Sequence, residues 1–281
     1  MWLVLCGPED RSALWAYEGL RERGLAPIDV VEPETLTRSA RSAHRVDEDR
    51  ASFEIALPDG RTLASGDIDG LLNRLTWAPV DHLVFASRAD TCYAMEEMSA
   101  LVLSWLRCVA PVAVNRPSPR GLSGAWRSPA EWTVLASAAG LPVSPLSLSS
   151  RVLAEAHPYG RDEAEGDASS TATAHTVVVL GDHVFGGDPV RALAPACRRL
   201  ARLADAELLG IDLDLGDRVD QVDVDRLGGV DRGDVRFLRA TPMPDLRVGG
   251  DALLDSLHEH LTRLPLETPR PVKPRTSARP R

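Results

Sequence analysis

The chain has 281 residues, enough for two domains or one domain with lobes, and its 44% hydrophobic and 26% charged residues are typical of a globular protein. Its net charge of −9 excludes a general binder of nucleic acid or anionic membranes, and no apolar run approaches the roughly 20 residues of a membrane span. Its 32 Lys+Arg residues include one lysine, Lys273, so a phosphate-binding cation elsewhere must be arginine.

The first 117 residues predict a parallel sheet covered by helices, because their opening has a β-α-β order. A hairpin is expected around the Pro58-Asp59-Gly60 turn, since these residues favour a tight reversal between two short apolar runs. The predicted elements are strands at 2–6, 28–31, 53–57, 61–63, 70–75 and 112–114, and helices at 11–23 and 90–108.

The second half predicts three helices and four short strands. Ser128 and Glu131 form a capping box with proline between them at the first helical position, and Gly140 ends that helix. The remaining predicted elements are strands at 175–180, 183–185, 208–215 and 235–240, and helices at 188–204 and 251–264.

Two segments have compositions that cannot bury enough apolar area to become ordered. Residues 151–174 are polar and rich in small side chains, and the tail is basic and rich in proline. The predicted organisation is therefore an N-terminal α/β domain at 1–117, a connecting helix and the start of a central lobe at 118–150, a flexible linker at 151–174, a C-terminal lobe at 175–265 and a disordered basic tail at 266–281.

The order of several short motifs resembles the ATP-grasp superfamily, in particular its ribosomal-protein glutamate ligases and peptide-crosslinking ligases. The motifs are VAVNRP at 112–117, AGLPVSP at 139–145, VVVLGDHVFGG at 177–187, the helix at 197–204 and GIDL at 210–213. The resemblance covers roughly residues 70 to 260. It implies an α/β, ATP-grasp-like fold, with a small parallel-sheet N-terminal domain followed by a reduced α+β C-terminal lobe.

The sequence departs from this family where phosphate and metal would bind. The last strand of the family carries E-x-N, which binds magnesium, whereas Arg239 and Thr241 stand at these positions here. Between Pro145 and His175 there is no lysine and no glycine-rich flap, and the segment is about half the length that the family uses. A cation at the glutamate position would repel a metal ion.

Asp212 and Asp214 are the candidate metal ligands. They alternate on one predicted strand, so both carboxylates face the same side. The resemblance places Asp212 where the family offers an acidic ligand, and the alternative is a solvated edge in an acidic chain. Arg239 is expected on an inner strand facing a cleft, paired with one of these aspartates, because an unpaired buried cation is costly.

A candidate ligand-binding cleft is predicted from residues at the ends of strands, where ligands of α/β proteins usually bind. The alternative is that arginine ends many strands by chance. The candidate residues are Asn73, Arg74, Arg88, Asn115, Arg116 and Arg239.

Three functions follow from these observations. The leading hypothesis is an ATP-grasp-like protein without phosphoryl chemistry or cofactors, acting as an accessory or peptide-binding subunit of a biosynthetic system. The second is an active carboxylate–amine ligase that needs ATP and Mg²⁺, with arginines in place of lysines and Asp212 or Asp214 holding the metal. The third is an unrelated α/β enzyme.

The four cysteines are far apart and form no C-x-x-C, which favours a reducing cytoplasm.

Overall fold

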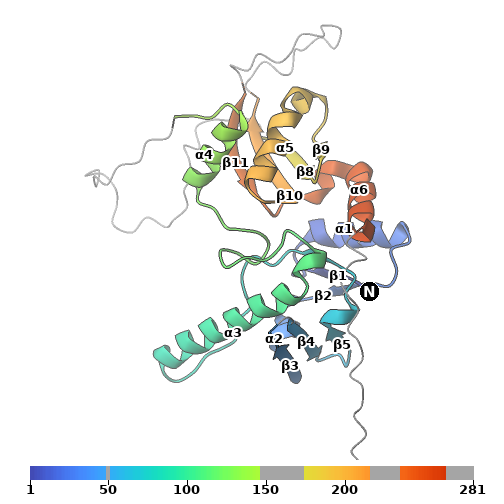
Figure 1. Cartoon of the computed structure of the whole chain (residues 1–281), viewed down its shortest axis with the longest axis vertical. Coiled ribbons are helices and arrows are strands. Elements are labelled where there is room, and N and C mark those ends of the chain that lie inside the picture. The colour runs from blue at the N-terminus through green and yellow to red at the C-terminus, as the bar shows by residue number, and fades with distance from the viewer. Residues whose placement is uncertain (49–50, 146–173, 216–234, 264–281) are drawn as a thin grey trace, which may run out of the picture.

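The computed structural model describes residues 1–48, 51–145, 174–215 and 235–263. Two lobes lie one above the other, joined by a connection between β7 and α4, and helices α1 and α6 lie side by side where the lobes meet (Figure 1). Within the described residues, no helix is both long and apolar enough to cross a membrane.

The N-terminal lobe is built on a parallel four-stranded sheet with the order β2-β1-β6-β7. Successive residues of β1 face opposite sides, so Leu3 and Leu5 enter one apolar cluster while Val4 enters another. Both faces of the sheet are therefore buried. Its strands and the helix that follows β1 are β1 (Trp2–Leu5), α1 (Arg11–Glu22), β2 (Ile28–Val31), β6 (Gly70–Asn73) and β7 (Ala113–Val114).

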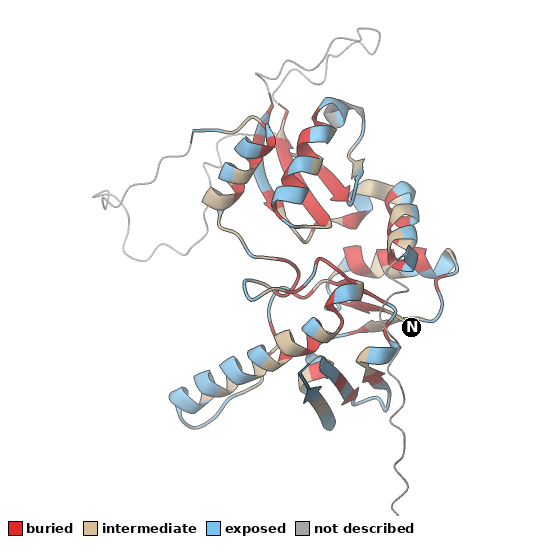
Figure 2. Ribbon diagram, in the orientation of Figure 1, coloured by how far each residue is buried: buried red, intermediate tan, exposed pale blue. Residues whose placement is uncertain are grey.

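A second, antiparallel sheet and the long helix α3 cover one face of the parallel sheet. The C-terminal half of helix α3 packs on the antiparallel sheet, and Val102 and Trp105 are buried there. The N-terminal half of the helix projects from the lobe, and its residues are mostly exposed or half-buried (Figure 2). The elements are α2 (Pro33–Thr37), β3 (Arg41–Val46), β4 (Ala51–Ala56), β5 (Thr62–Ala64) and α3 (Arg88–Cys108).

The upper lobe is an antiparallel sheet with the order β11-β10-β8-β9, and helices α4 and α5 cover one face of it. Val177 and Val179 of β8 face these helices, while Val178 and Leu180 face the cluster shared with α1 and α6. The elements are α4 (Pro129–Ala139), β8 (Ala174–Leu180), β9 (His183–Phe185), α5 (Ala194–Leu203), β10 (Leu208–Asp214), β11 (Arg236–Thr241) and α6 (Gly250–Arg263).

The two lobes share a core and are tied by polar contacts. Arg74, whose side chain is only 6% exposed, pairs with Asp10 at 2.8 Å and donates to the carbonyl of Pro244 at 2.9 Å. Arg23 on α1 pairs with Asp251 and Asp255 on α6, at 2.9 and 2.6 Å. The position of β11 relative to the N-terminal lobe is therefore fixed by packing and by buried hydrogen bonds.

The α/β class and the order of the main elements are confirmed, and so is the hairpin at 53–63, whose strands β4 and β5 pair antiparallel. The hairpin belongs to a three-stranded sheet, and neither its third strand, β3, nor helix α2 was predicted. The helix predicted from residue 188 begins as a 3-10 turn, and α5 starts only at Ala194. Pro195 explains this start, because proline fits the first helical turn but not the interior of a helix.

The segments predicted to be flexible fall largely outside the described residues. This holds for 151–173 of the predicted linker and for all of the predicted basic tail at 266–281. Ala174, the last residue assigned to the linker, instead opens β8 and pairs with Asp214 across the sheet.

Candidate functional site

Asp212 and Arg239 form an ion pair on the open side of the upper sheet. Arg239 Nε lies 2.6 Å from Asp212 Oδ2, and the Thr176 hydroxyl donates to Asp212 Oδ1 at 2.7 Å. Both carboxylate oxygens of the buried Asp212 are therefore occupied. The predicted pairing of Arg239 with an aspartate is confirmed.

The prediction that Arg239 lies on an inner strand was wrong. Strand β11 is the edge strand of its sheet as described, and the Arg239 side chain is 79% exposed. An exposed ion pair of this kind contributes little to stability, about 0–1 kcal/mol. Its importance is chemical, because it places a cation beside the acidic group that the family resemblance assigned to a metal.

Magnesium does not fit this arrangement. The ion requires near-ideal octahedral oxygen ligands, and here the guanidinium of Arg239 occupies the carboxylate that would have to bind it. Asp214 lies two residues further along β10, opposite Ala174 and Arg236. Among the described residues, no group of three or more His, Cys, Asp or Glu side chains is arranged to hold a metal ion.

Three of the other predicted cleft residues make contacts inside the protein. Buried Asn73 donates to the Leu122 carbonyl at 2.8 Å and accepts from the Leu75 N–H at 3.1 Å, which shapes the turn after β6. Arg74 forms the contacts between the lobes given above. Asn115, at the end of β7, bonds to four backbone groups of the upper lobe.

The remaining two predicted cleft residues are exposed. Arg116 lies 3.9 Å from Glu207, and Arg88 is the first residue of α3. Of the six residues predicted for the cleft, Arg239 is the one that lines the cavity described next.

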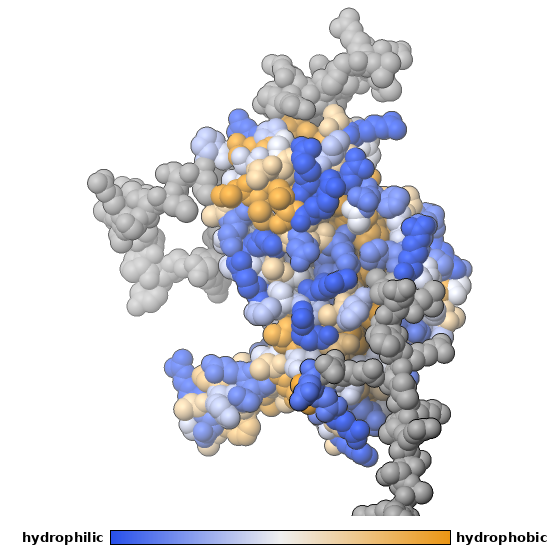
Figure 3. Space-filling model, in the orientation of Figure 1, coloured by the Kyte–Doolittle hydropathy of each residue, from blue (hydrophilic) through white to orange (hydrophobic). Residues whose placement is uncertain are grey.

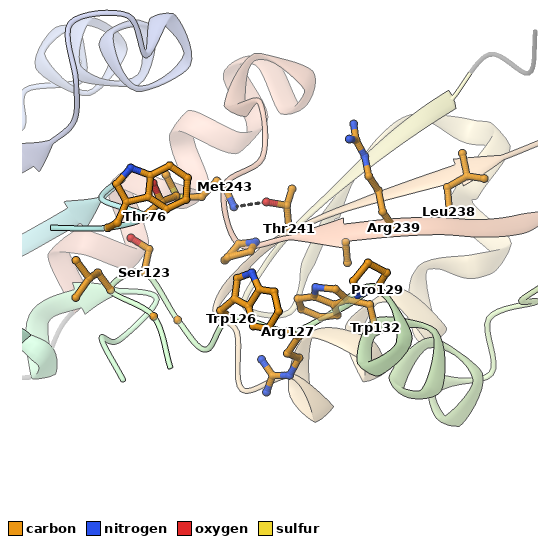
Figure 4. A pocket seen from close by; sticks show the side chains of 16 residues that line it. Thr76, Ser123, Trp126, Arg127, Pro129, Trp132, Leu238, Arg239, Thr241 and Met243 are labelled. Atoms are coloured by element: carbon orange, nitrogen blue, oxygen red, sulfur yellow. Dashed lines mark hydrogen bonds between the residues drawn. The ribbon is translucent and has the colours of Figure 1, made fainter. Parts of the chain in front are cut away.

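A cavity of about 390 Å³ lies where the two lobes meet beside β11 (Figure 4). Its lining is mostly apolar and contains three tryptophans, Trp77, Trp126 and Trp132. Figure 4 shows Trp126 and Trp132 on one side of β11 and the guanidinium of Arg239 on the other. A largely apolar cavity with a few polar groups at its rim is the usual form of a binding site.

The tryptophans differ in how firmly they are held. Trp132 is buried under the guanidinium of Arg127, which lies 5.4 Å from the ring centroid. Trp77 and Trp126 are 76% and 64% exposed. Apolar surface gathers around α4 on the face seen in Figure 3. Such exposed aromatic side chains beside a cavity are typical of an interaction site.

The N-terminus of α4 positions Trp132. The Ser128 hydroxyl accepts from the Glu131 N–H at 3.3 Å, and the Glu131 carboxylate accepts from the Ser128 N–H at 2.8 Å, which is the predicted capping box. Arg120 lies 2.7 Å from the same carboxylate. The fixed cap holds the first turn of α4, and with it Pro129 and Trp132, against the cavity.

We expect Glu131→Gln to reduce the acid sensitivity of the fold. The Arg120 guanidinium, followed by the Ser128 N–H, lowers the pKa of Glu131 to about 2, from an ordinary value of 4.5. The stability that the ionised carboxylate contributes is therefore present above pH 4.5 and lost as the pH falls towards 2. Melting temperatures at pH 5 and pH 3 should differ less in the variant than in the wild type. Glu22→Gln, an exposed change on α1, is the control, and equal differences in all three proteins would contradict the role of the cap.

The cavity was not predicted from the sequence. The signal was the segment at 118–128, SPRGLSGAWRS, which places two glycines, a tryptophan and two arginines in a connection between domains. Glycines allow the backbone to turn tightly there, since a side chain at Gly121 would lie 2.4 Å from the Gly124 carbonyl oxygen. The other cavity residues come from distant parts of the chain.

Comparisons with known proteins show the ATP-grasp fold. No protein-family model and no curated protein matches the chain. Among solved structures, the ATP-grasp ligase PsnB complexed with a minimal precursor, Mg and ADP matches with a TM-score of 0.57 and 17% identity, over 93% of this chain and 98% of that chain. The macrocyclase MdnC from Microcystis aeruginosa MRC, bound with the precursor peptide MdnA, has a TM-score of 0.61 and 10% identity, over 93% and 99%.

A RiPP-associated ATP-grasp ligase from Chryseobacterium gregarium, in complex with ADP and a leader and core peptide, has a TM-score of 0.58 and 10% identity, over 93% and 95%. At these identities the likeness establishes the fold. The chain therefore has the fold of these ATP-grasp ligases, and the predicted resemblance in fold is confirmed. This likeness in fold gives no support to the hypothesis of an unrelated α/β enzyme.

Proposed function

We propose that this protein is a peptide-binding ATP-grasp-like subunit of a peptide-modifying biosynthetic system and does not transfer phosphoryl groups with magnesium. The observation that carries the proposal is the Asp212–Arg239 ion pair at 2.6 Å. Phosphoryl transfer in this fold requires metal ions that neutralise the developing charge on the phosphates. Arg239 supplies a fixed cation at one metal-ligand position but cannot bridge two phosphate oxygens and a carboxylate as a metal does.

Peptide binding is supported by the cavity beside β11 and by the solved structures of the same fold. PsnB, MdnC and the Chryseobacterium ligase each have a precursor, or leader and core, peptide in their solved complexes. Aromatic side chains supply most of the binding energy at many protein interfaces, and Trp77 and Trp126 present theirs to solvent here.

The cytoplasm suits such a protein, because Cys6, Cys92, Cys108 and Cys197 are all free thiols.

The second candidate is an active ATP- and Mg²⁺-dependent peptide ligase. The comparisons favour this function over the first, because the solved structures that share the fold are named as ligases or macrocyclases and several contain ADP with or without Mg. In this protein such a ligase would have to hold magnesium through Asp212 or Asp214 after Arg239 had moved away, and arginines would have to bind the phosphates.

Calorimetry with ATP, in the presence and absence of MgCl₂, separates the two functions. The proposal expects no magnesium-dependent binding of ATP in the micromolar range. Tight binding that requires magnesium would instead establish the ligase as the better function. Arg239→Ala, measured in parallel, shows whether the guanidinium is what excludes the metal. If the variant gains magnesium-dependent binding of ATP that the wild type lacks, the ion pair is the cause.

A further inference from the structure

Among the described residues, the outer edge of β11 has no partner beyond its first residues. On its inner side β11 pairs with β10, and on its outer side the Phe237 N–H donates to the Pro142 carbonyl at 2.7 Å. From Leu238 to Thr241, no described residue outside β10 makes a backbone hydrogen bond with the strand. A free strand edge of this kind offers unpaired N–H and C=O groups to another chain.

The cavity follows this open edge. Six consecutive residues, 238–243, line it, and Trp126 and Trp132 approach the same strand from the connection and from α4 (Figure 4). Backbone groups and aromatic surface therefore lie within one site. An added strand needs both, because main-chain hydrogen bonds provide affinity and pockets for alternate side chains provide specificity.

The charge of the lining is opposite to the charge of the chain. The protein carries a net charge of −9, yet the 16 lining residues include no aspartate or glutamate. Of the two arginines among them, Arg239 is paired with Asp212 and its guanidinium lies on the other side of β11 from Trp126, so Arg127 is the cation left for a ligand on the tryptophan side. Arg127 has no ion-pair partner among the described residues, and its Nη1 donates only to the Ala125 carbonyl. A ligand with carboxylates is therefore favoured over a basic one.

We propose that the cavity binds an extended, acidic peptide segment, which pairs as an additional strand with residues 238–241 of β11 and places a large apolar side chain against Trp126. The proposal rests on the proposed peptide-binding function and gives its mode of recognition. An added strand rises about 3.4 Å per residue, so a peptide of about five residues spans the open edge. Because side chains alternate, carboxylates two residues before and after the apolar anchor lie on the same face as that anchor.

The probe is the blocked peptide Ac-Glu-Thr-Phe-Thr-Glu-NH₂, and its binding is followed by tryptophan fluorescence and calorimetry. Three changes in the probe test the three parts of the proposal. Alanine in place of phenylalanine, N-methylation of the two backbone amides nearest the phenylalanine, and lysine in place of both glutamates should each weaken binding about tenfold or more. If N-methylation leaves the affinity unchanged, the strand-addition mode is wrong.

The protein variant Trp126→Ala should weaken binding of the probe by about tenfold and keep the fold, because Trp126 is exposed. Tyr93→Ala removes a similarly exposed aromatic ring from α3 and should leave binding unchanged. Arg127→Gln should reduce the preference for glutamate over lysine in the probe. Arg202→Gln, an exposed change on α5, is its charge-matched control.

Hydrogen–deuterium exchange locates the probe directly. The amides of residues 238–241 should exchange more slowly when the probe is bound, and those of the projecting half of α3 should not change. Protection of 238–241 that grows with protein concentration in the absence of the probe would assign the edge to a second copy of the chain and overturn the proposal.

The outcomes separate this inference from the proposed function. Magnesium-dependent binding of ATP would refute the non-catalytic function while leaving the peptide site intact. Failure of the unmodified probe to bind would refute the site while leaving the nucleotide result unchanged.

Discussion

Replacing Asn115 by alanine lowers the free energy of unfolding by about 3–5 kcal/mol. The side chain is 2% exposed, and its amide nitrogen donates to the Leu208 and Pro242 carbonyls at 2.7 and 3.1 Å. Its oxygen accepts from the N–H groups of Glu207 and Leu208 at 3.0 and 2.9 Å. Alanine leaves four backbone groups without a partner, and each buried group of this kind costs about 1–3 kcal/mol, reduced where water can enter.

Backbone conformation adds to the effect. Asn115 has φ 57, in the left-handed region, where asparagine is tolerated and alanine costs about 1–2 kcal/mol. Asn115→Gly removes the same hydrogen bonds without this strain and should therefore be less destabilised than Asn115→Ala. Urea denaturation followed by circular dichroism measures both variants. Arg116→Ala, at the next and exposed position, should stay within about 0.5 kcal/mol of the wild type. If Asn115→Ala lowered the free energy of unfolding by less than about 1 kcal/mol, the hydrogen bonds of Asn115 to the upper lobe would not be what stabilises the fold.

The sequence predicted those helices and strands whose ends and conformation depend on neighbouring residues in the chain. The capping box at Ser128 and Glu131 and the left-handed Gly140 fixed both ends of α4, because both depend on residues within one or two turns. The strand at 175–180 was likewise predicted from its own run of β-branched and apolar residues, which the structure shows as β8. Strand β3 was missed because its sequence, RSAHRV, is largely exposed and shows no apolar alternation, so its strand state depends on pairing with β4.

The site depends on contacts that no local pattern encodes. Its cavity is assembled from residues 76–77, 121–132 and 238–243, which are far apart in the chain. The pairing of Arg239 with an aspartate was predictable, since opposite charges on facing strands attract. That β11 would be an edge strand was not, because strand order follows from long-range packing. Asn115, interpreted from its position at a strand end as a ligand-binding residue, is instead engaged in contacts between the lobes.

The double variant Arg239→Glu, Thr241→Asn should gain a divalent-cation site that the wild type lacks. It restores the E-x-N pattern that the family resemblance assigns to magnesium. Glutamate at 239 replaces the guanidinium beside Asp212 with a second carboxylate, and two close carboxylates repel each other unless a cation lies between them. Without metal, the variant should therefore be less stable than the wild type.

Magnesium should reverse this loss. A site of two carboxylates with water-completed coordination has a dissociation constant of about 1 mM, so 10 mM MgCl₂ stabilises the folded variant by about 1.4 kcal/mol. For a protein of this size the melting temperature then rises by about 3–5 °C, as measured by differential scanning fluorimetry. Arg202→Glu, which makes the same charge change on the exposed face of α5, should show no such rise. The wild type should show none either, because Arg239 occupies the carboxylate of Asp212. An equal rise in the wild type would mean that magnesium displaces Arg239 from Asp212, and the ion pair would then be no obstacle to a ligase activity.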